Sequence, residues 1–177
     1  MTVHQHLLSR HLDMSLHRVW IAEELHCASF PIYNLSGKLL GYQRYRPGAS
    51  KALNNDPSEG RYFTRLVNGD IGIWGLESWS LSDTLFLVEG LFDAARLTSR
   101  GYSAIAVFSN EPSYSAREWL YASCSNRRVV AVCDNDTPGR KLSRYGHTHH
   151  VMEDGKDLGE ASDSYVTGFL KEYTWVQ

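Results

Sequence analysis

The sequence has few cysteines, no long apolar run and almost no net charge. Its three cysteines, Cys27, Cys124 and Cys133, form no C-x-x-C pair, which excludes a zinc ribbon and argues against a disulfide framework. No apolar stretch approaches the roughly 20 residues that a membrane span needs. A formal net charge of −2 is untypical of a protein that coats nucleic acid non-specifically. We therefore expect a reduced, cytoplasmic protein without zinc and without a membrane partner.

The second half of the chain alternates apolar runs with helical segments. We predict strands over residues 85–88, 104–108, 128–133 and 149–152, and helices over 92–99, 116–122 and 163–173. Thr137 and Pro138 are typical of a helix start, with Thr137 as the N-cap. This βαβα order predicts an α/β fold with a mainly parallel sheet flanked by helices.

The first half differs, and we treat residues 1–82 as a smaller lobe and residues 83–177 as the sheet domain. Apolar spacing over residues 4–26 predicts a helical segment. Two hairpins follow, one turning at Ser36 and Gly37 and one at Asn68 and Gly69, with a polar loop over residues 47–60 between them. The lobe is therefore expected to be α+β.

Acidic side chains follow two of the predicted strands. Glu89 and Asp93 come after the first strand, and Asp134 and Asp136 after the third, while Asp157 follows a glycine turn. Ligands of open α/β sheets bind at the carboxyl ends of the strands, so these acids should gather there. An isolated acid in such a place is usually a helix cap or a turn former. Several together would repel one another unless a hard cation neutralised them, which predicts a site for Mg²⁺ (or Mn²⁺) and phosphate chemistry.

Glycines and cations near these acids are candidate phosphate contacts. Gly139 leaves room for a phosphate or a metal-bound water at the start of the predicted helix. Arg140 and Lys141 line that helix, although a solvated helix face explains them equally well. The candidate nucleotide or phosphate contacts are Gly90, Gly139, Arg140 and Lys141.

A basic segment lies in the first half of the chain, with tyrosines and a phenylalanine interleaved. Arginine and aromatic side chains in alternation suit a single strand, because guanidinium groups bind phosphates and rings stack on bases. A solvated hairpin face with core aromatics would give the same composition. The candidate nucleic-acid contacts are Lys38, Arg44, Arg46, Lys51, Arg61 and Arg65.

The ordered acidic motifs over residues 83–160 resemble the TOPRIM domain, which replicative primases, topoisomerases, OLD-type nucleases and RecR-like proteins share. Residues 30–34, 37–43 and 72–76 resemble the segment that precedes TOPRIM in phage-type primases. The resemblance implies that Glu89 is the acid/base or metal-organising carboxylate and that Asp134 and Asp136 carry Mg²⁺. It implies supporting roles for Asp93 and Asp157, and a basic cleft for template and nucleotide.

The function that this resemblance implies is DNA-templated synthesis of short RNA primers from nucleoside triphosphates on single-stranded DNA. The implied setting is viral replication, in the host cytoplasm. The sequence has no zinc-binding template reader and no Walker A loop, so a separate template-reading module or a replicative helicase is an expected partner.

Three alternatives use the same residues. A metal-dependent nuclease needs the same acids, with water as the nucleophile. A non-catalytic module could bind single-stranded nucleic acid during replication or recombination. A topoisomerase fragment is disfavoured, because 177 residues are too few for strand-gate domains.

Overall fold

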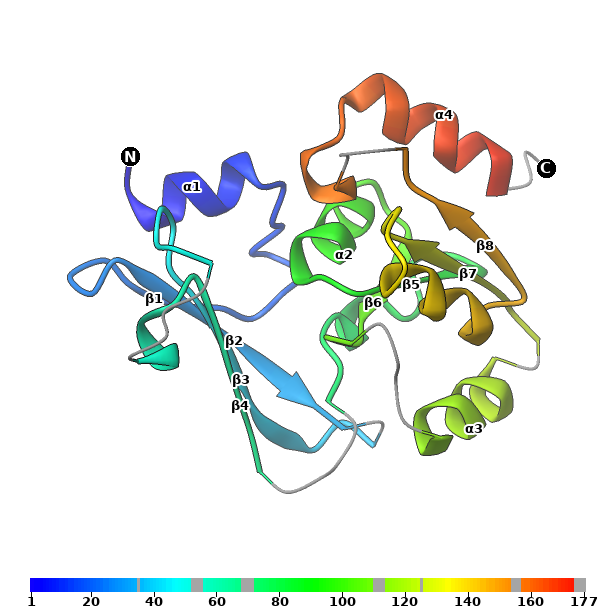
Figure 1. Ribbon diagram of the computed structural model, residues 1–177, viewed down its shortest axis with the longest axis horizontal. Helices are drawn as coiled ribbons and strands as arrows, with labels where there is room; N and C mark the ends of the chain where they lie inside the picture. The colour runs from blue at the N-terminus through cyan, green and yellow to red at the C-terminus, as the bar shows by residue number, and fades with distance from the viewer. Residues whose placement is uncertain are drawn as a thin grey trace.

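A computed structural model of the chain describes residues 1–34, 36–51, 56–67, 72–109, 114–124, 126–153 and 157–173. It contains two four-stranded sheets, one parallel and one antiparallel, that lie side by side (Figure 1). No helix within these ranges is both long enough and apolar enough to cross a membrane.

The parallel sheet confirms the predicted α/β fold. Its strands run in the order β6 (Ser103–Ala106), β5 (Thr84–Val88), β7 (Arg128–Cys133) and β8 (Thr148–Val151), and every neighbouring pair is parallel. β5 is buried at all five positions, as expected of a central strand with both faces covered.

Helices cover both faces of this sheet. On one face, α2 (Leu91–Thr98) and α4 (Asp163–Tyr173) pack over Phe86, Val88 and Val130. On the other face, α3 (Tyr114–Ser123) and a 3₁₀ helix (Gly139–Tyr145) pack over Leu85 and Leu87. Alternate residues of one strand thus serve opposite faces, which is the side-chain period of a strand.

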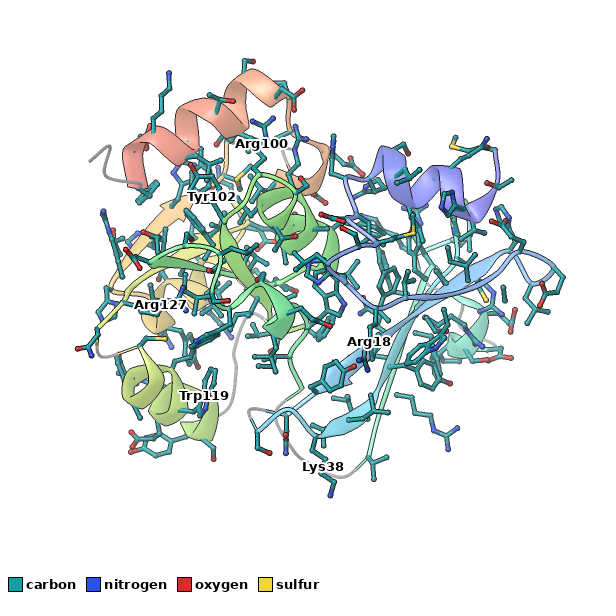
Figure 2. All side chains as sticks on the ribbon, turned by 180° about the vertical axis from the view of Figure 1, so that it is seen from behind. Arg18, Lys38, Arg100, Tyr102, Trp119 and Arg127 are labelled. Carbon is teal, nitrogen blue, oxygen red and sulfur yellow. The ribbon has the colours of Figure 1, made fainter. Side chains whose placement is uncertain are left out.

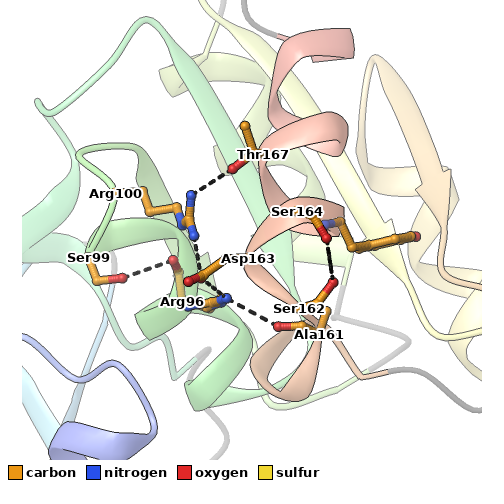
Figure 3. A network of polar contacts seen from close by, with 9 residues as sticks. Arg96, Ser99, Arg100, Ala161, Ser162, Asp163, Ser164 and Thr167 are labelled. Atoms are coloured by element: carbon orange, nitrogen blue, oxygen red, sulfur yellow. Dashed lines mark hydrogen bonds and ion pairs between the residues drawn. The ribbon is translucent and has the colours of Figure 1, made fainter.

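An arginine pair fixes α4 to α2 (Figure 3). Arg96, almost fully buried, and Arg100 each donate to Asp163 Oδ1 at 2.5 Å. Arg96 also donates to the Ala161 carbonyl, and Arg100 to Thr167 Oγ1. These hydrogen bonds hold the pKa of Asp163 below its usual value. The resulting negative charge lies at the start of α4, where it is favoured by the helix dipole.

The antiparallel sheet contains β1 (Trp20–Ala22), β2 (Cys27–Tyr33), β3 (Leu39–Tyr45) and β4 (Tyr62–Leu66), in that order. β2 and β3 form the hairpin that Ser36 and Gly37 predict, and Gly37 has the positive φ of +80° that a glycine allows. Side chains at alternate positions of β3 and β4 face the parallel sheet, among them Gln43 opposite Thr64 and Tyr45 opposite Tyr62.

Trp74 joins the two sheets. Ile73 pairs with Tyr33 of β2, and the next residue, Trp74, pairs with Ala106 of β6. The Trp74 side chain is fully buried and packs against Phe30 and His17. Because Asn68 and Gly69 lie outside the described residues, the second predicted hairpin turn is not seen, but residues 73 and 74 pair with β2 and β6 rather than with β4.

The predicted helical segment over residues 4–26 is largely wrong. α1 spans only Val3–Ser9, begun by a capping box between Thr2 and Gln5. His11 and His26 have positive φ angles of 60° and 47°, which end helical geometry. Between them the chain forms turns and β1. The apolar residues of this segment do not share one buried helix face, because Leu7 and Leu12 are buried whereas Leu8 and Trp20 are exposed.

The predicted N-cap at Thr137 is also wrong. The segment after β7 is the 3₁₀ helix Gly139–Tyr145, preceded by Pro138, and no side chain caps it from that position. The Gly139 N–H instead donates to Asp136 Oδ1 at 2.5 Å. A carboxylate one residue earlier took the capping role, as Asp side chains commonly do in turns.

Candidate active site

The two central strands place Glu89 and Asp134 at one edge of the parallel sheet. β5 and β7 are direct parallel neighbours, with Leu87 opposite Ala131. Glu89 follows the last residue of β5, and Asp134 the last residue of β7. Parallel strands end at the same edge, so the sequence prediction that these acids gather is confirmed.

A cleft of about 400 Å³ opens at this edge, between the two sheets. Four acids, Glu89, Asp93, Asp134 and Asp157, line the side formed by the parallel sheet and α2. Polar and basic side chains from the N-terminal lobe line the opposite side. The lining residues from that lobe are Arg10, Gln43, Lys51, Tyr62 and Thr64.

Asp93 is the most deeply buried of these four acids. It lies in the first turn of α2, and its Oδ1 accepts from the Gly159 N–H at 2.9 Å. Burial and the adjacent Asp157 carboxyl raise the pKa of Asp93 well above its usual value. Gly90, the N-cap of α2, must be small, because a Cβ there would lie 2.6 Å from Asp93 Oδ2.

Burial and the neighbouring carboxylates both raise the pKa values of these acids. Burial raises the pKa of Glu89, and the charges of Asp134 and Asp136 raise it further. Burial, Asp157 and Asp136 likewise raise the pKa of Asp134, while Lys51 lowers it. The carboxylates therefore lie close enough to compete for positive charge.

Asp136 lies beside the cleft rather than in its lining. One of its oxygens accepts from Gly139, and a Cβ at Gly139 would lie 2.8 to 2.9 Å from Asp134 and Asp136 atoms. Glycine at position 139 thus lets the backbone approach both aspartates closely, which is the role that the sequence analysis expects of it. Arg140 donates to Asn135 Oδ1, so this candidate phosphate contact is engaged with its own loop. Lys141 also lies outside the cleft lining.

The donor set fits a hard cation. Carboxylate oxygens are the ligands that Mg²⁺ prefers, and the neighbouring carboxylates that add to the effect of burial on the pKa values of Glu89 and Asp134 are negative charges that a cation would offset. Among the described residues, no three His, Cys, Asp or Glu side chains converge closely enough to hold a metal ion in this structure. Glu89, Asp134 and Asp136 are the residues that would hold the cation.

The six predicted nucleic-acid contacts do not form one surface. Only Lys51 lines the cleft. Arg44 and Arg46 both donate to the Ser58 carbonyl, and Arg61 Nε donates to the Ala49 carbonyl at 2.8 Å. These three arginines fasten the ends of the loop that carries Lys51.

The two remaining cations lie elsewhere. Arg65 is exposed on β4, on the sheet face opposite to that of Thr64 and the cleft. Lys38 is exposed at the β2–β3 turn (Figure 2), outside the cleft lining.

Comparison with known proteins rests on structure alone, because no protein-family model and no curated protein matches the sequence. A structure titled as the DnaG catalytic core aligns with 94% of this chain at a TM-score of 0.67 and 16% identity. The chain has the fold of a primase catalytic core. It spans 71% of that solved chain.

Other primase structures agree. A DnaG primase catalytic domain bound to single-stranded DNA aligns with 80% of the chain, at a TM-score of 0.58 and 17% identity. The primase fragment of the bacteriophage T7 primase-helicase aligns over 80%, at a TM-score of 0.53 and 13% identity. This chain spans 51% and 59% of those two solved chains.

Within the primase-core fold, several lining residues escaped the sequence analysis, among them Arg10, Gln43 and Phe108. Arg10 comes from the segment after α1, and Gln43 from β3, where it is buried and donates to Thr64 Oγ1. Phe108 follows β6 with a φ of +55°, unusual for an aromatic residue, and its N–H donates to the Glu89 carbonyl. The alternation of side chains along β3 could have placed Gln43 on the sheet face opposite to that of the neighbouring arginine side chains. No sequence signal marked Arg10 or Phe108.

Proposed function

We propose that this protein is a DNA primase that synthesises short RNA primers on single-stranded DNA from nucleoside triphosphates. One observation carries the proposal: a primase-core fold in which the carboxylates of two central strands face basic and polar side chains across a cleft. Identity to the aligned primases is 13 to 17%, so the activity itself rests on the residues of the cleft.

The carboxylates would divide the work. Asp134 and Asp136, with Glu89 or Asp157 completing the set, would hold Mg²⁺ or Mn²⁺, which neutralises negative charge that develops on a transferred phosphoryl group. Glu89 would orient the metal or accept the proton of the attacking 3′ hydroxyl, a role that suits a carboxylate with a raised pKa. Asp93 would act as a supporting residue, because its hydrogen bond from the Gly159 N–H holds the segment after Asp157 in place.

The basic residues would serve the template and nucleotide in different ways. Lys51 would face the nucleotide in the cleft, held there by the arginines that fasten its loop. Arg65 and Lys38 would meet single-stranded DNA on exposed surface. Gly90, Gly139, Arg140 and Lys141 would border the phosphates at the loops after β5 and β7. A replicative helicase or a separate template-reading module would act as partner.

A primer-synthesis assay tests the proposal. Purified protein would be mixed with single-stranded DNA, labelled ribonucleotides and Mg²⁺ or Mn²⁺, beside Asp134→Ala and the control Glu24→Gln. Glu24 is exposed in the turn between β1 and β2, and it lies outside the cleft lining. Labelled oligonucleotides from the wild type and Glu24→Gln, but not from Asp134→Ala, would support a primase.

Other products would point elsewhere. Shortened template without synthesis, again lost in Asp134→Ala, would make the protein a metal-dependent nuclease. DNA binding that survives chelation of Mg²⁺ and the loss of Asp134, with neither product formed, would favour a non-catalytic binding module. Either result would overturn the primase proposal.

A further inference from the structure

Arg10 reaches into the cleft from the start of the chain. It is the C-cap residue of α1, and its side chain is 16% exposed. The guanidinium carbon lies 4.4 Å from the centre of the Phe92 ring in α2, in a cation–π contact. Arg10 thereby lines the same cleft as Glu89 and Asp134.

Only one end of the guanidinium is used. Nη1 donates to Glu160 Oε1 at 3.2 Å, and Glu160 is itself 67% exposed. Nε is buried without a hydrogen-bond partner, and no described residue accepts from Nη2. Nε and Nη2 together form the side-on fork with which arginine binds carboxylate or phosphate in a bidentate manner.

The surroundings hold this fork in place. Phe92 fixes the plane of the guanidinium, and Glu160 fixes its far end. Gly159 packs closely beside it, because a Cβ there would lie 3.1 Å from Arg10 Nη2 and 3.0 Å from Asp157 Oδ1. A donor pair that is already ordered loses little conformational entropy when an anion binds.

We propose that the Nε–Nη2 edge of Arg10 binds a phosphate group of the substrate in the cleft. The phosphate belongs either to a nucleoside triphosphate or to the backbone of the nucleic-acid strand, and both offer the same anionic oxygens. The choice of substrate rests on the proposed function, whereas the binding itself does not require catalysis.

Equilibrium binding tests the proposal without any chemistry. The wild type, Arg10→Ala and Arg10→Lys would be titrated with tripolyphosphate, GTP and guanosine, and with a labelled single-stranded oligodeoxynucleotide without terminal phosphates. Arg18→Ala is the matched control, because Arg18 is an exposed arginine of the same segment, outside the cleft lining (Figure 2). Thermal melting of each variant would show that it is folded.

Loss of the fork should weaken phosphate binding about 10- to 100-fold in Arg10→Ala, since hydrogen bonds between charged groups are of that strength. Arg10→Lys keeps the charge and the ion pair with Glu160 but not the fork, so it should recover only part of the affinity. Guanosine binding and the Arg18→Ala variant should be unchanged. Arg10→Lys decides the matter if Arg10→Ala does not fold.

The pattern of losses identifies the source of the phosphate. Weaker GTP and tripolyphosphate binding with an unchanged oligonucleotide would assign Arg10 to the triphosphate, and the reverse would assign it to the strand backbone. Equal affinities in the wild type and folded Arg10→Lys, or an equal loss in Arg18→Ala, would overturn the proposal. A protein that binds phosphate through Arg10 but makes no primers would refute the proposed function alone.

Discussion

Asp134→Asn should have opposite effects on the stability of the folded protein and on primer synthesis. The substitution removes one negative charge and keeps the size of the side chain. Asp136 and Asp157 raise the pKa of Asp134, and Asp134 in turn raises that of Glu89, while Lys51 acts in the opposite direction. Removing the charge therefore relieves at least three repulsions and forfeits one attraction.

The size of the gain follows from the exposure of these groups. Interactions between exposed charges contribute about 0.2 to 1 kcal/mol each, because water screens them. Three such repulsions less one attraction leave a net gain of about 0.5 to 2 kcal/mol in the free energy of unfolding. For a chain of this length we expect the melting temperature to rise by about 2 to 6 °C, while primer synthesis is lost.

The pH dependence has a definite sign. A raised carboxyl pKa in the folded state means that the protonated form is favoured, so its stabilising effect is present below the unfolded pKa of about 4 and is lost as the pH rises through the folded value. The stability gain of Asp134→Asn should therefore be small near pH 4 and largest near pH 7.

Melting curves in a chelating buffer at several pH values, with and without added Mg²⁺, would measure this. Mg²⁺ should raise the melting temperature of the wild type and have less effect on Asp134→Asn. Glu24→Gln should stay within about 0.5 kcal/mol of the wild type. A wild type as stable as Asp134→Asn at pH 7 without metal would refute the argument that the carboxylates repel one another.

Three further substitutions test the architecture around the cleft. Gly139→Ala would place a Cβ within 2.9 Å of Asp134 and Asp136 atoms and should lower primer yield at least about 10-fold by displacing both, whereas Gly168→Ala, with nothing within 4 Å in α4, should be neutral or stabilise by about 0.5 to 1 kcal/mol in urea unfolding. Trp74→Ala should cost about 3 to 5 kcal/mol in the same assay because the ring is fully buried, while Trp20→Ala, 56% exposed, should cost less than about 1 kcal/mol. Arg65→Ala should weaken binding to single-stranded DNA and lower the salt dependence of that binding by about one charge. Arg46→Ala should lower primer yield without a change in DNA binding, since Arg46 fastens the Lys51 loop. Equal effects of the two variants on DNA binding would contradict the assignment.

Local sequence rules were enough to place the carboxylates. β5 and β7 are apolar at nearly every position, which marks strands buried on both faces, and the chain order of strands and helices fixes them as parallel. Once the strands are known, Glu89 and Asp134 must lie at their carboxyl ends. The helix predicted over residues 92–99 is α2, Leu91–Thr98, and Gly101, three residues after its last residue, has a φ of +81°.

The opposite side of the cleft could not be predicted in the same way. Composition grouped Arg44, Arg46, Arg61 and Arg65 as one basic surface, but the acceptors for the first three are carbonyl groups of Ser58 and Ala49. Backbone carbonyls carry no sequence signal. Arg10 was missed for a related reason: its place depends on α1 ending at residue 9, and the apolar spacing predicted a helix that continued past it.

The two sides of the cleft depend on each other. Lys51 of the N-terminal lobe is the positive charge that lowers the pKa of Asp134, and Arg10 of the same lobe lines the cleft beside both acids. Trp74 holds that lobe in place through its pairing with β6 and its burial beside Phe30. A substitution that loosens Trp74 should therefore weaken phosphate binding as well as folding, because the cations would leave the carboxylates before the parallel sheet itself unfolds.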